Sequence, residues 1–394
     1  MSHYASPTAA AVKAADISRR NFIGTAASGL IASAVSSSGV SHAAEKELGE
    51  KSETKAGSNE QKAIRWGFVG TGNIANSMAR TLQLTTAGQL AASSSRTLEK
   101  AEAFASKHGA KKAFDSWKEM IDWDGIDAIY VATPTSVREE ICVAAANAGK
   151  HVLGEKPFAS LPSVQRITEA CRKNNVAFMD GTHFSHHPRT TTLRSKLDSL
   201  VGKRRSVDSV FQFRLRDSSN IRMQPKLEPM GAIGDAGWYN MRAIVDFLDS
   251  GVKLEGLSAY LRRDPKTGAV IGATGVIAFV DGSTSTWSCG FDAGAGRAGL
   301  SIDGNIGAVD IENFIRQDKD NSASYRYRSR GGKKKAVDQV VRIESSLPGS
   351  ALMFEDFAAQ IHDKSLRDRW KRKSERTQEL LDAVWASAIQ NENP

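Results

Sequence analysis

A glycine-rich turn between a short apolar run and an amphipathic segment most constrains how this chain can fold. Residues 64–69 read as a buried strand, the sequence GTGNIA follows at once, and apolar residues then recur at helical spacing. G-x-G-x-x-A is common by chance, but between a strand and a helix it indicates a dinucleotide site. Gly70 permits the tight turn, and Gly72 lets the main chain approach a pyrophosphate at the helix N-terminus. The predicted pyrophosphate contacts are Gly70, Thr71, Gly72, Asn73 and Ile74.

Strands and helical segments continue to alternate after this turn. Strands separated by helices predict a doubly wound parallel sheet with right-handed crossovers. We therefore expect an α/β Rossmann domain over residues 63–182. Further strands are predicted at 90–93, 127–132, 151–154 and 176–179, and helices at 98–108, 137–148 and 162–174.

The end of the second strand predicts which dinucleotide is bound. An NAD enzyme carries Asp or Glu there for the ribose 2′-hydroxyl, whereas this chain has Ser95 and Arg96, with Lys100 one turn further on. A hydroxyl and a guanidinium suit a 2′-phosphate, which Arg can hold through two parallel hydrogen bonds. The prediction is therefore NADP, and the alternative is that Arg96 only faces solvent at the start of a helix.

Two loops follow the fourth and fifth strands, at the edge where open α/β sheets bind ligands. They are Thr133-Pro134 and Glu155-Lys156-Pro157. Together with the glycine motif, they resemble the glucose-fructose oxidoreductase / inositol dehydrogenase (Gfo/Idh/MocA) family, of which the E-K-P triplet is the most recognisable mark. The resemblance extends from residue 63 to the C-terminus. It implies cofactor contacts from Thr133, Pro134, Glu155 and Lys156.

The second half of the chain, residues 183–394, contains more strands. Alternation at 211–215 and turn signals at 270–289 and 300–311 predict strands and hairpins. Apolar spacing predicts closing helices at 353–361 and 377–389. The resemblance implies an α+β domain here, with one open, mostly antiparallel sheet and helices on its inner face. It also implies a substrate site between the domains and a homo-oligomer, either a dimer or a tetramer.

The segment DAGWY at 235–239 matches the family element D-x-G-x-[HY] and places Tyr239 at the acid/base position. Oxidation of an alcohol needs a group that takes the hydroxyl proton, and free Tyr, with a pKa of about 10, is a poor base at neutral pH. A nearby Lys156 and an oxidised nicotinamide would both favour the phenolate. If the segment is helical, Asp235 lies on the same face and would bind substrate hydroxyls or orient Lys156.

Each predicted catalytic residue also has a plainer interpretation. Tyr239 would be an aromatic at the edge of the core, Lys156 a surface lysine and Asp235 a helix-capping carboxylate. Arg138 stands where the family often has His, and it would suit an anionic substrate. No metal site is predicted, because the histidines lack a carboxylate or thiolate partner at ligand spacing. The candidates for lining the substrate pocket are Arg138, His183, His186 and Trp238.

Residues 1–43 resemble a twin-arginine export signal. The sequence SRRNF at 18–22 matches the motif, a run rich in Ala, Gly and Ser follows, and the small residues of SHA at 41–43 suit cleavage. Such signals are addresses rather than anchors, so we expect a bacterial protein exported to the periplasm. The alternative is a disordered tail with a chance Arg pair. Residues 44–62 are polar and predict a solvated linker.

Charge and composition exclude little else. Lys and Arg number 53 against 44 Asp and Glu, which gives a formal net charge of +9. We interpret basic tracts at 325–335 and 371–373 as a solvated hairpin and the exposed start of a helix, and we expect no nucleic-acid partner. No run of eighteen apolar residues predicts a membrane span, and three cysteines do not make a disulfide scaffold.

Three functions follow from these observations. The first is an NADP-dependent oxidoreductase of a sugar, a polyol or a related secondary alcohol, with the cofactor held tightly as in glucose-fructose oxidoreductase. The second is a dihydrodiol- or xylose-dehydrogenase-like enzyme that exchanges its cofactor. The third is a non-catalytic dinucleotide-binding protein on the same fold. The presence of Lys156 together with Tyr239 favours an enzyme.

Overall fold

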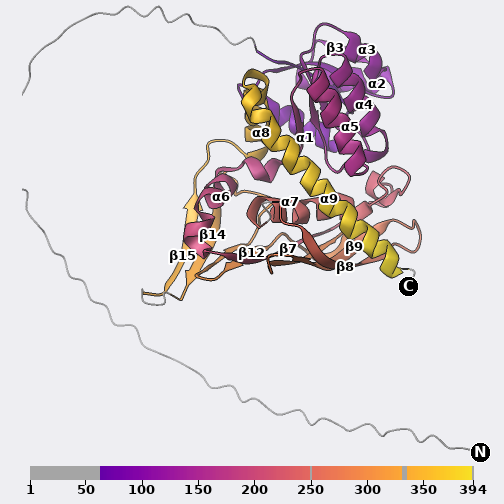
Figure 1. Ribbon diagram of the computed structural model, residues 1–394. Coiled ribbons are helices and arrows are strands. Elements are labelled where there is room, and N and C mark those ends of the chain that lie inside the picture. The colour runs from indigo at the N-terminus through magenta and orange to yellow at the C-terminus, as the bar shows by residue number, and fades with distance from the viewer. Residues whose placement is uncertain (1–62, 249–250, 331–334, 393–394) are drawn as a thin grey trace, which may run out of the picture. The chain divides into compact units, whose positions relative to one another are not determined.

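The computed structural model describes residues 63–248, 251–330 and 335–392. The predicted export signal and linker, residues 1–62, lie outside the described part of the chain. Two β-sheets follow each other along the described residues (Figure 1). Helices pack on both faces of the first sheet and on one face of the second.

The first sheet is parallel, and its six described strands run in the order β3-β2-β1-β4-β5-β6. The order reverses beside β1, as in the doubly wound fold that the sequence predicts. The elements are β1 (Arg65–Val69), α1 (Asn73–Leu82), β2 (Gln89–Ser94), α2 (Leu98–His108), β3 (Lys112–Phe114), α3 (Trp117–Asp122), β4 (Ala128–Val131), α4 (Thr135–Asn147), β5 (His151–Gly154), α5 (Leu161–Lys173) and β6 (Phe178–Asp180).

Local sequence explains most of these elements. All four residues of β4 are apolar and buried, as expected of a parallel strand covered on both faces. Thr97 caps α2 by accepting a hydrogen bond from the Lys100 N–H, and Gly109 ends the same helix in the left-handed conformation. The sequence does not predict β3 and α3, because three and six residues are too few to show a period.

The second sheet is mostly antiparallel, and β7 with β10 is its parallel pair among the described strands. Its order is β15-β14-β13-β12-β7-β10-β9-β8, with β11 also paired to β7. The predicted α+β fold class of this half is confirmed. The strands are β7 (Arg204–Arg214), β8 (Leu254–Arg263), β9 (Val270–Phe279), β10 (Thr284–Gly290), β11 (Asp292–Arg297), β12 (Leu300–Gly304), β13 (Ala308–Ile311), β14 (Ala323–Ser329) and β15 (Val337–Ile343).

Several helical segments of the second half pack against its own sheet, and α8 and α9 also pack against elements of the first half. The C-terminal helix α9 packs on β6 of the first sheet and on β8 of the second (Figure 1). These segments are η1 (His183–His186), α6 (Pro188–Val201), η2 (Ile221–Met223), the π-helical turn η3 (Ile233–Gly237), α7 (Trp238–Phe247), α8 (Gly349–His362), η4 (Lys364–Leu366) and α9 (Arg367–Glu392).

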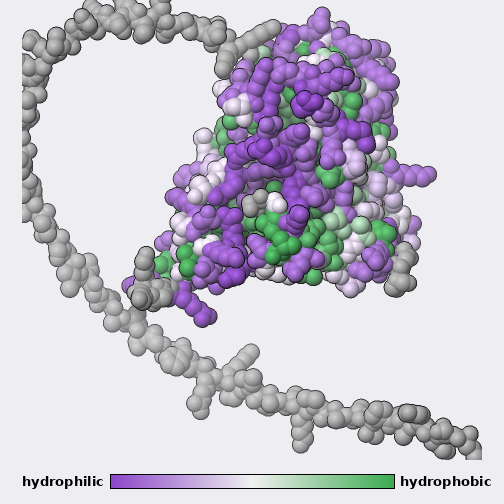
Figure 2. Space-filling model, viewed as in Figure 1, coloured by the Kyte–Doolittle hydropathy of each residue, from purple (hydrophilic) through white to green (hydrophobic). Residues whose placement is uncertain are grey.

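Aromatic packing joins α8 of the second half to β1, a central strand of the first sheet. Trp66 of β1 is fully buried and contacts Phe354 and Phe357 of α8, with ring centroids 5.1 and 5.4 Å apart. Burying such rings contributes a large share of core stability, so α8 is an integral cover of the first sheet. In the view of Figure 2, hydrophilic residues dominate the surface over the first sheet, and apolar residues show mainly lower down, over the second.

The two basic tracts have different outcomes. The first falls on the antiparallel pair β14 and β15, so the predicted hairpin is confirmed for the residues that are described there. The second lies near the start of α9, but Lys373 is not exposed as predicted: its side chain is 13% accessible and is ion-paired with the buried Asp246. Burial of the ammonium lowers the pKa of Lys373 to about 8.

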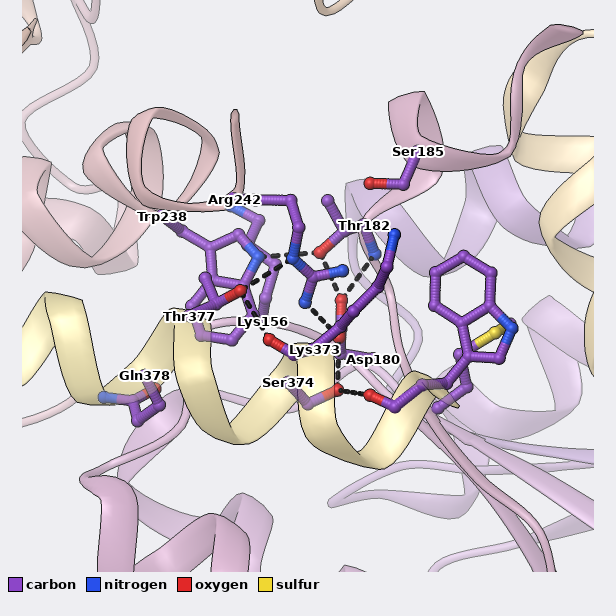
Figure 3. A network of polar contacts seen from close by, with 12 residues as sticks. Lys156, Asp180, Thr182, Ser185, Trp238, Arg242, Lys373, Ser374, Thr377 and Gln378 are labelled. Atoms are coloured by element: carbon purple, nitrogen blue, oxygen red, sulfur yellow. Dashed lines mark hydrogen bonds and ion pairs between the residues drawn. The ribbon is translucent and has the colours of Figure 1, made fainter. Parts of the chain in front are cut away.

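A buried ionic network joins β6, α7 and α9 (Figure 3). Asp180, at the end of β6, accepts hydrogen bonds from Arg242 of α7 and from the hydroxyl of Ser374 in α9. Both Asp180 and Arg242 have side chains with no accessible surface. Burial alone would raise the pKa of Asp180, but the Arg242 charge holds it below its usual range. The network therefore fixes α7 against the edge of the first sheet.

Replacement of Asp180 tests this network. Asp180→Asn keeps the shape but leaves the buried Arg242 guanidinium without its counter-charge, so we expect a loss of about 3–5 kcal/mol in the free energy of unfolding. Urea denaturation followed by tryptophan fluorescence measures the loss. The matched control is Asp338→Asn, whose ion pair with Arg326 is about half exposed on both sides and should matter little. Equal denaturation midpoints for the two variants would contradict a structural role for Asp180.

Candidate active site

A cavity of about 1350 Å³ lies between the carboxyl edge of the first sheet and the second sheet. It is lined by the glycine turn, by the loops after β4 and β5, and by residues of β7, η2 and η3. A smaller hollow of about 620 Å³ on the second sheet contains none of the predicted site residues. The predicted residues that line the large cavity are Gly72, Asn73, Ile74, Thr133, Arg138, Glu155, Lys156, His183, Asp235 and Tyr239.

The glycine turn has the geometry of a phosphate site. Gly70 has a φ of +97°, its N–H donates to Ser94 O at 2.8 Å, and a Cβ there would lie 2.9 Å from Ala132 O. Gly72 is the N-cap of α1 but provides no side-chain cap, and a Cβ there would meet no atom within 4 Å. The first amides of α1 therefore have no side-chain cap, and the space beside Gly72 lets an anionic phosphate approach them.

The predicted 2′-phosphate residues lie beside this turn. The hydroxyls of Ser95 and Thr71 are 3.1 Å apart, which joins the end of β2 to the glycine turn. Arg96 and Lys100 are exposed at the start of α2. No carboxylate among the described residues is ion-paired with Arg96. Its guanidinium is therefore available to an anion.

Hydrogen bonds from buried and half-buried side chains hold the loops after β4 and β5 in place. The buried carboxylate of Glu155 accepts a hydrogen bond from the Tyr130 hydroxyl, and burial raises the pKa of Glu155. Thr135, which follows Pro134 at the start of α4, donates its N–H and hydroxyl to Glu228 at 3.0 and 2.6 Å. Arg138 donates to the main-chain oxygens of Thr133 and Pro157. Although Arg138 lines the cavity as predicted, its visible role is to tie the two loops together.

The three predicted catalytic residues come together in the cavity. The Lys156 ammonium donates to the Asp235 carboxylate at 2.8 Å and to the Asp235 main-chain oxygen at 2.9 Å. The same ammonium lies 4.7 Å from the centre of the Tyr239 ring. Asp235 belongs to the π-helical turn η3 and Tyr239 to the first turn of α7. Of the two predicted roles for Asp235, the structure shows the orientation of Lys156.

Sequence reasoning missed Arg222. Its guanidinium donates to both oxygens of the Asp235 carboxylate, to Oδ2 at 2.8 Å and to Oδ1 at 3.1 Å. Burial alone would raise the pKa of Asp235, but the charges of Lys156 and Arg222 hold it well below its usual range. The short helix η2 that carries Arg222 lies in an irregular stretch with no motif, so no local signal marks it.

Tyr239 differs electrostatically from the sequence expectation. Burial and the nearby carboxylate of Glu155 raise its pKa well above 10, whereas the sequence argument expected Lys156 to lower it. The Tyr239 hydroxyl lies 3.2 Å from Nε2 of His183. Burial and the Lys156 charge lower the pKa of His183 to about 4, so the imidazole is neutral at physiological pH. A protonated phenol paired with a neutral imidazole therefore faces the cavity.

Two predicted substrate residues do not line the cavity. Trp238 is fully buried, and its indole N–H donates to the Thr182 hydroxyl at 2.7 Å. Consecutive helical residues project about 100° apart, so Trp238 cannot share the direction of Tyr239. His186 is also buried: Nδ1 is 2.6 Å from Asp356, and the ring stacks on Trp370 at 4.3 Å. Both residues belong to the buried core next to residues that line the cavity.

Within residues 63–392, apart from the short gaps, no cluster of three or more His, Cys, Asp or Glu side chains is arranged to hold a metal ion. No helix in this part of the chain is long and apolar enough to cross a membrane.

One family model matches the part of the chain that forms the first sheet and its helices. Residues 64–182 match the model described as "Oxidoreductase family, NAD-binding Rossmann fold". This match and the names of the relatives support the glucose-fructose oxidoreductase / inositol dehydrogenase family that the motifs indicate.

Several curated relatives are named as oxidoreductases of sugars or polyols. A dTDP-3,4-didehydro-2,6-dideoxy-alpha-D-glucose 3-reductase from Actinomadura kijaniata is 29% identical over 58% of this chain and 69% of its own length. The scyllo-inositol 2-dehydrogenase (NADP(+)) of Bacillus subtilis is 34% identical over 45% of this chain and 56% of its own length.

Solved structures share the whole fold of the described residues. A 3-ketoreductase from Actinomadura kijaniata, solved with NADP and TDP-benzene, is similar with a TM-score of 0.74 and 24% identity, over 82% of this chain and 98% of that one. The aldose-aldose oxidoreductase of Caulobacter crescentus, complexed with glycerol, also has a TM-score of 0.74, with 18% identity over 84% and 98% of the two chains. At these identities the likeness supports the fold.

Proposed function

We propose that this chain is an NADP-dependent oxidoreductase that transfers hydride to or from a CH–OH carbon of a sugar, a polyol or a related secondary alcohol. The observation that carries the proposal is the Lys156–Asp235 pair beside Tyr239, in the cavity that the glycine turn also lines. One cavity thus combines a phosphate site with a proton donor or acceptor. The sugar and polyol oxidoreductases among the relatives point to the same chemistry.

NADP would supply the hydride acceptor or donor. The residues that would hold it are the first amides of α1 for the pyrophosphate, and Ser95 with Arg96 for the 2′-phosphate. Thr133 and Glu155, in the loops after β4 and β5, line the same cavity. The names of several relatives specify NADP, which supports this choice over NAD.

The protein's own residues manage the proton. Tyr239 exchanges a proton between its hydroxyl and the substrate oxygen, and the Lys156 ammonium stabilises negative charge that develops on either oxygen. Asp235 holds the Lys156 ammonium in position, and Arg222 in turn holds the Asp235 carboxylate. Because burial raises the pKa of Tyr239, the phenol is protonated at neutral pH and can supply the proton that a carbonyl oxygen takes up during reduction.

Substitutions of the proton-handling residues test the mechanism. Tyr239→Phe keeps the ring but removes the exchanging hydroxyl, so we expect turnover to fall at least about a hundredfold, and Lys156→Ala to act similarly. NADPH consumption with a panel of aldoses, inositols and ketosugars measures turnover, and fluorescence titration checks that NADP affinity is retained. Tyr260→Phe, at a tyrosine 58% exposed on β8, is the matched control. Unchanged rates in Tyr239→Phe would remove this residue from the mechanism.

Arg96 tests the choice of cofactor. Loss of a charged hydrogen bond to the 2′-phosphate should weaken NADP about 10- to 100-fold in Arg96→Ala. NAD lacks this phosphate, so its affinity should hardly change. Calorimetric titration of both nucleotides gives the two dissociation constants. Lys107→Ala, at an exposed lysine near the end of α2, controls for general loss of charge. Equal losses for NADP and NAD would defeat the assignment.

We further propose that the chain is exported through the twin-arginine route and carries NADP with it. The motif at 18–22 supports the route, which transports folded proteins. Replacing Arg19 and Arg20 together by Lys should leave the protein in the cytoplasm of a bacterial host, whereas the unaltered chain should reach the periplasm. Cell fractionation with immunodetection measures both, and mass analysis of the periplasmic protein detects bound nucleotide. Export of the double variant, or a periplasmic protein free of nucleotide, would contradict the respective part of the proposal.

A further inference from the structure

We propose that the substrate carries an anionic group, a carboxylate or a phosphate, which Arg316 holds beside the Tyr239–His183 pair. This inference rests on the proposed function and narrows its substrate class. Arg316 lines the same cavity as Tyr239, His183 and Lys156. No family motif covers this arginine, and the sequence alone does not single it out.

The main chain around Arg316 is held rigidly. The side-chain oxygen of Asn313 accepts hydrogen bonds from the N–H groups of Ile315 at 3.2 Å and Arg316 at 2.9 Å. Arg189, in the first turn of α6, donates to the main-chain oxygens of Asn313 and Phe314, both at 2.8 Å. A guanidinium is therefore buried beneath this segment, with Arg189 only 4% exposed, and fixes its position. The segment in turn fixes where Arg316 leaves the backbone.

The Arg316 side chain has no ion-pair partner within the part of the chain that the structure describes. It is exposed, and no carboxylate among the described residues is ion-paired with it. Asp318 is the nearest carboxylate in sequence, and it is ion-paired with Arg342 at 3.3 Å. Arg316 also adds to the effects of burial and Lys156 in lowering the pKa of His183, so its charge reaches the catalytic pair. A guanidinium at such a place can bind a carboxylate or phosphate through two hydrogen bonds.

The side chains that line the cavity carry a small formal surplus of positive charge. Asp235 is one carboxylate shared between Lys156 and Arg222. Glu228 is occupied by hydrogen bonds from Thr135. Glu312 lines the cavity without an ion pair among the described residues, and Arg297 does the same with the opposite charge. Counted over the whole lining, six cationic side chains face five carboxylates, which leaves a formal surplus of one positive charge; the cations are Arg138, Lys156, Arg189, Arg222, Arg297 and Arg316, and the carboxylates are Glu155, Glu228, Asp235, Glu312 and Asp318.

The cofactor's phosphates do not account for this charge. The predicted phosphate contacts lie on the first sheet, at the glycine turn before α1 and at the start of α2. Arg316 follows β13 of the second sheet, on the wall that provides Phe211 and Gln212 of β7. An anion held there belongs to the molecule that reacts at Tyr239.

Arg316→Gln tests the proposal in the full-length enzyme loaded with NADP(H). The probes are D-glucuronate, D-glucose 6-phosphate and D-glucose, which share a ring and differ in the anionic group. For wild type we expect at least one acidic probe to have a KM at least about tenfold below that of D-glucose. Arg316→Gln should raise this KM about tenfold or more, with little change in kcat or in the KM of D-glucose. Arg205→Gln, at an exposed arginine on β7 outside the cavity, is the matched control.

Calorimetric binding of the same probes gives a readout that does not depend on turnover. Tighter binding of D-glucuronate identifies a carboxylate site, tighter binding of D-glucose 6-phosphate a phosphate site, and both should weaken in Arg316→Gln and at high salt. The inference is overturned if neither acidic probe binds or reacts better than D-glucose, or if Arg316→Gln behaves as Arg205→Gln does. The proposed function fails separately, if no member of the wider sugar and polyol panel exchanges hydride with NADP(H).

Discussion

The ion pair between Lys156 and Asp235 is the contact on which the site depends, because it joins a loop of the first sheet to a helical turn that belongs to the second half of the described chain. Lys156 follows β5 at the edge of the first sheet, whereas Asp235 lies in the π-helical turn before α7, which packs on the second. The side chains of Lys156 and Asp235 are both largely buried, and a buried charge without its counter-charge is strongly destabilising. The pair therefore holds the loop after β5 against the turn η3 at the cavity. Arg222 completes the pairing of the carboxylate, and Tyr239 lies within reach of the ammonium as a consequence.

A second layer of contacts holds the elements that carry this pair. Asp180 and Arg242 lock α7 to β6, and α9 supplies Ser374 to the same network (Figure 3). Further along α9, the side-chain oxygen of Gln378 accepts a hydrogen bond from the Phe158 N–H at 3.1 Å, two residues beyond Lys156. The long helix α9 thus contacts the elements that carry both catalytic segments, and it packs on both sheets.

Local patterns predict the first half of the fold well and the site only in part. Buried strands such as β4, helix caps such as Thr97 and the glycine turn are encoded by neighbouring residues, so sequence reasoning finds them. Sequence reasoning placed His183 in the pocket but found neither its contact with Tyr239 nor Arg222, because these contacts depend on how the fold brings separate segments together. Trp238 and His186 have the right residue types but point into the core, and only packing decides that direction.

The sequence by itself determined the doubly wound domain, the phosphate-binding turn and the residue types that pair a lysine with a tyrosine, since each is written in a short stretch of chain. Only the tertiary structure decided how charge is distributed around Tyr239. A pKa depends on burial and on every charge within a few ångströms, and folding brings those groups together from both sheets. For the same reason, the local sequence does not indicate that Arg316 lies on the wall of the cavity, because only folding places its segment there.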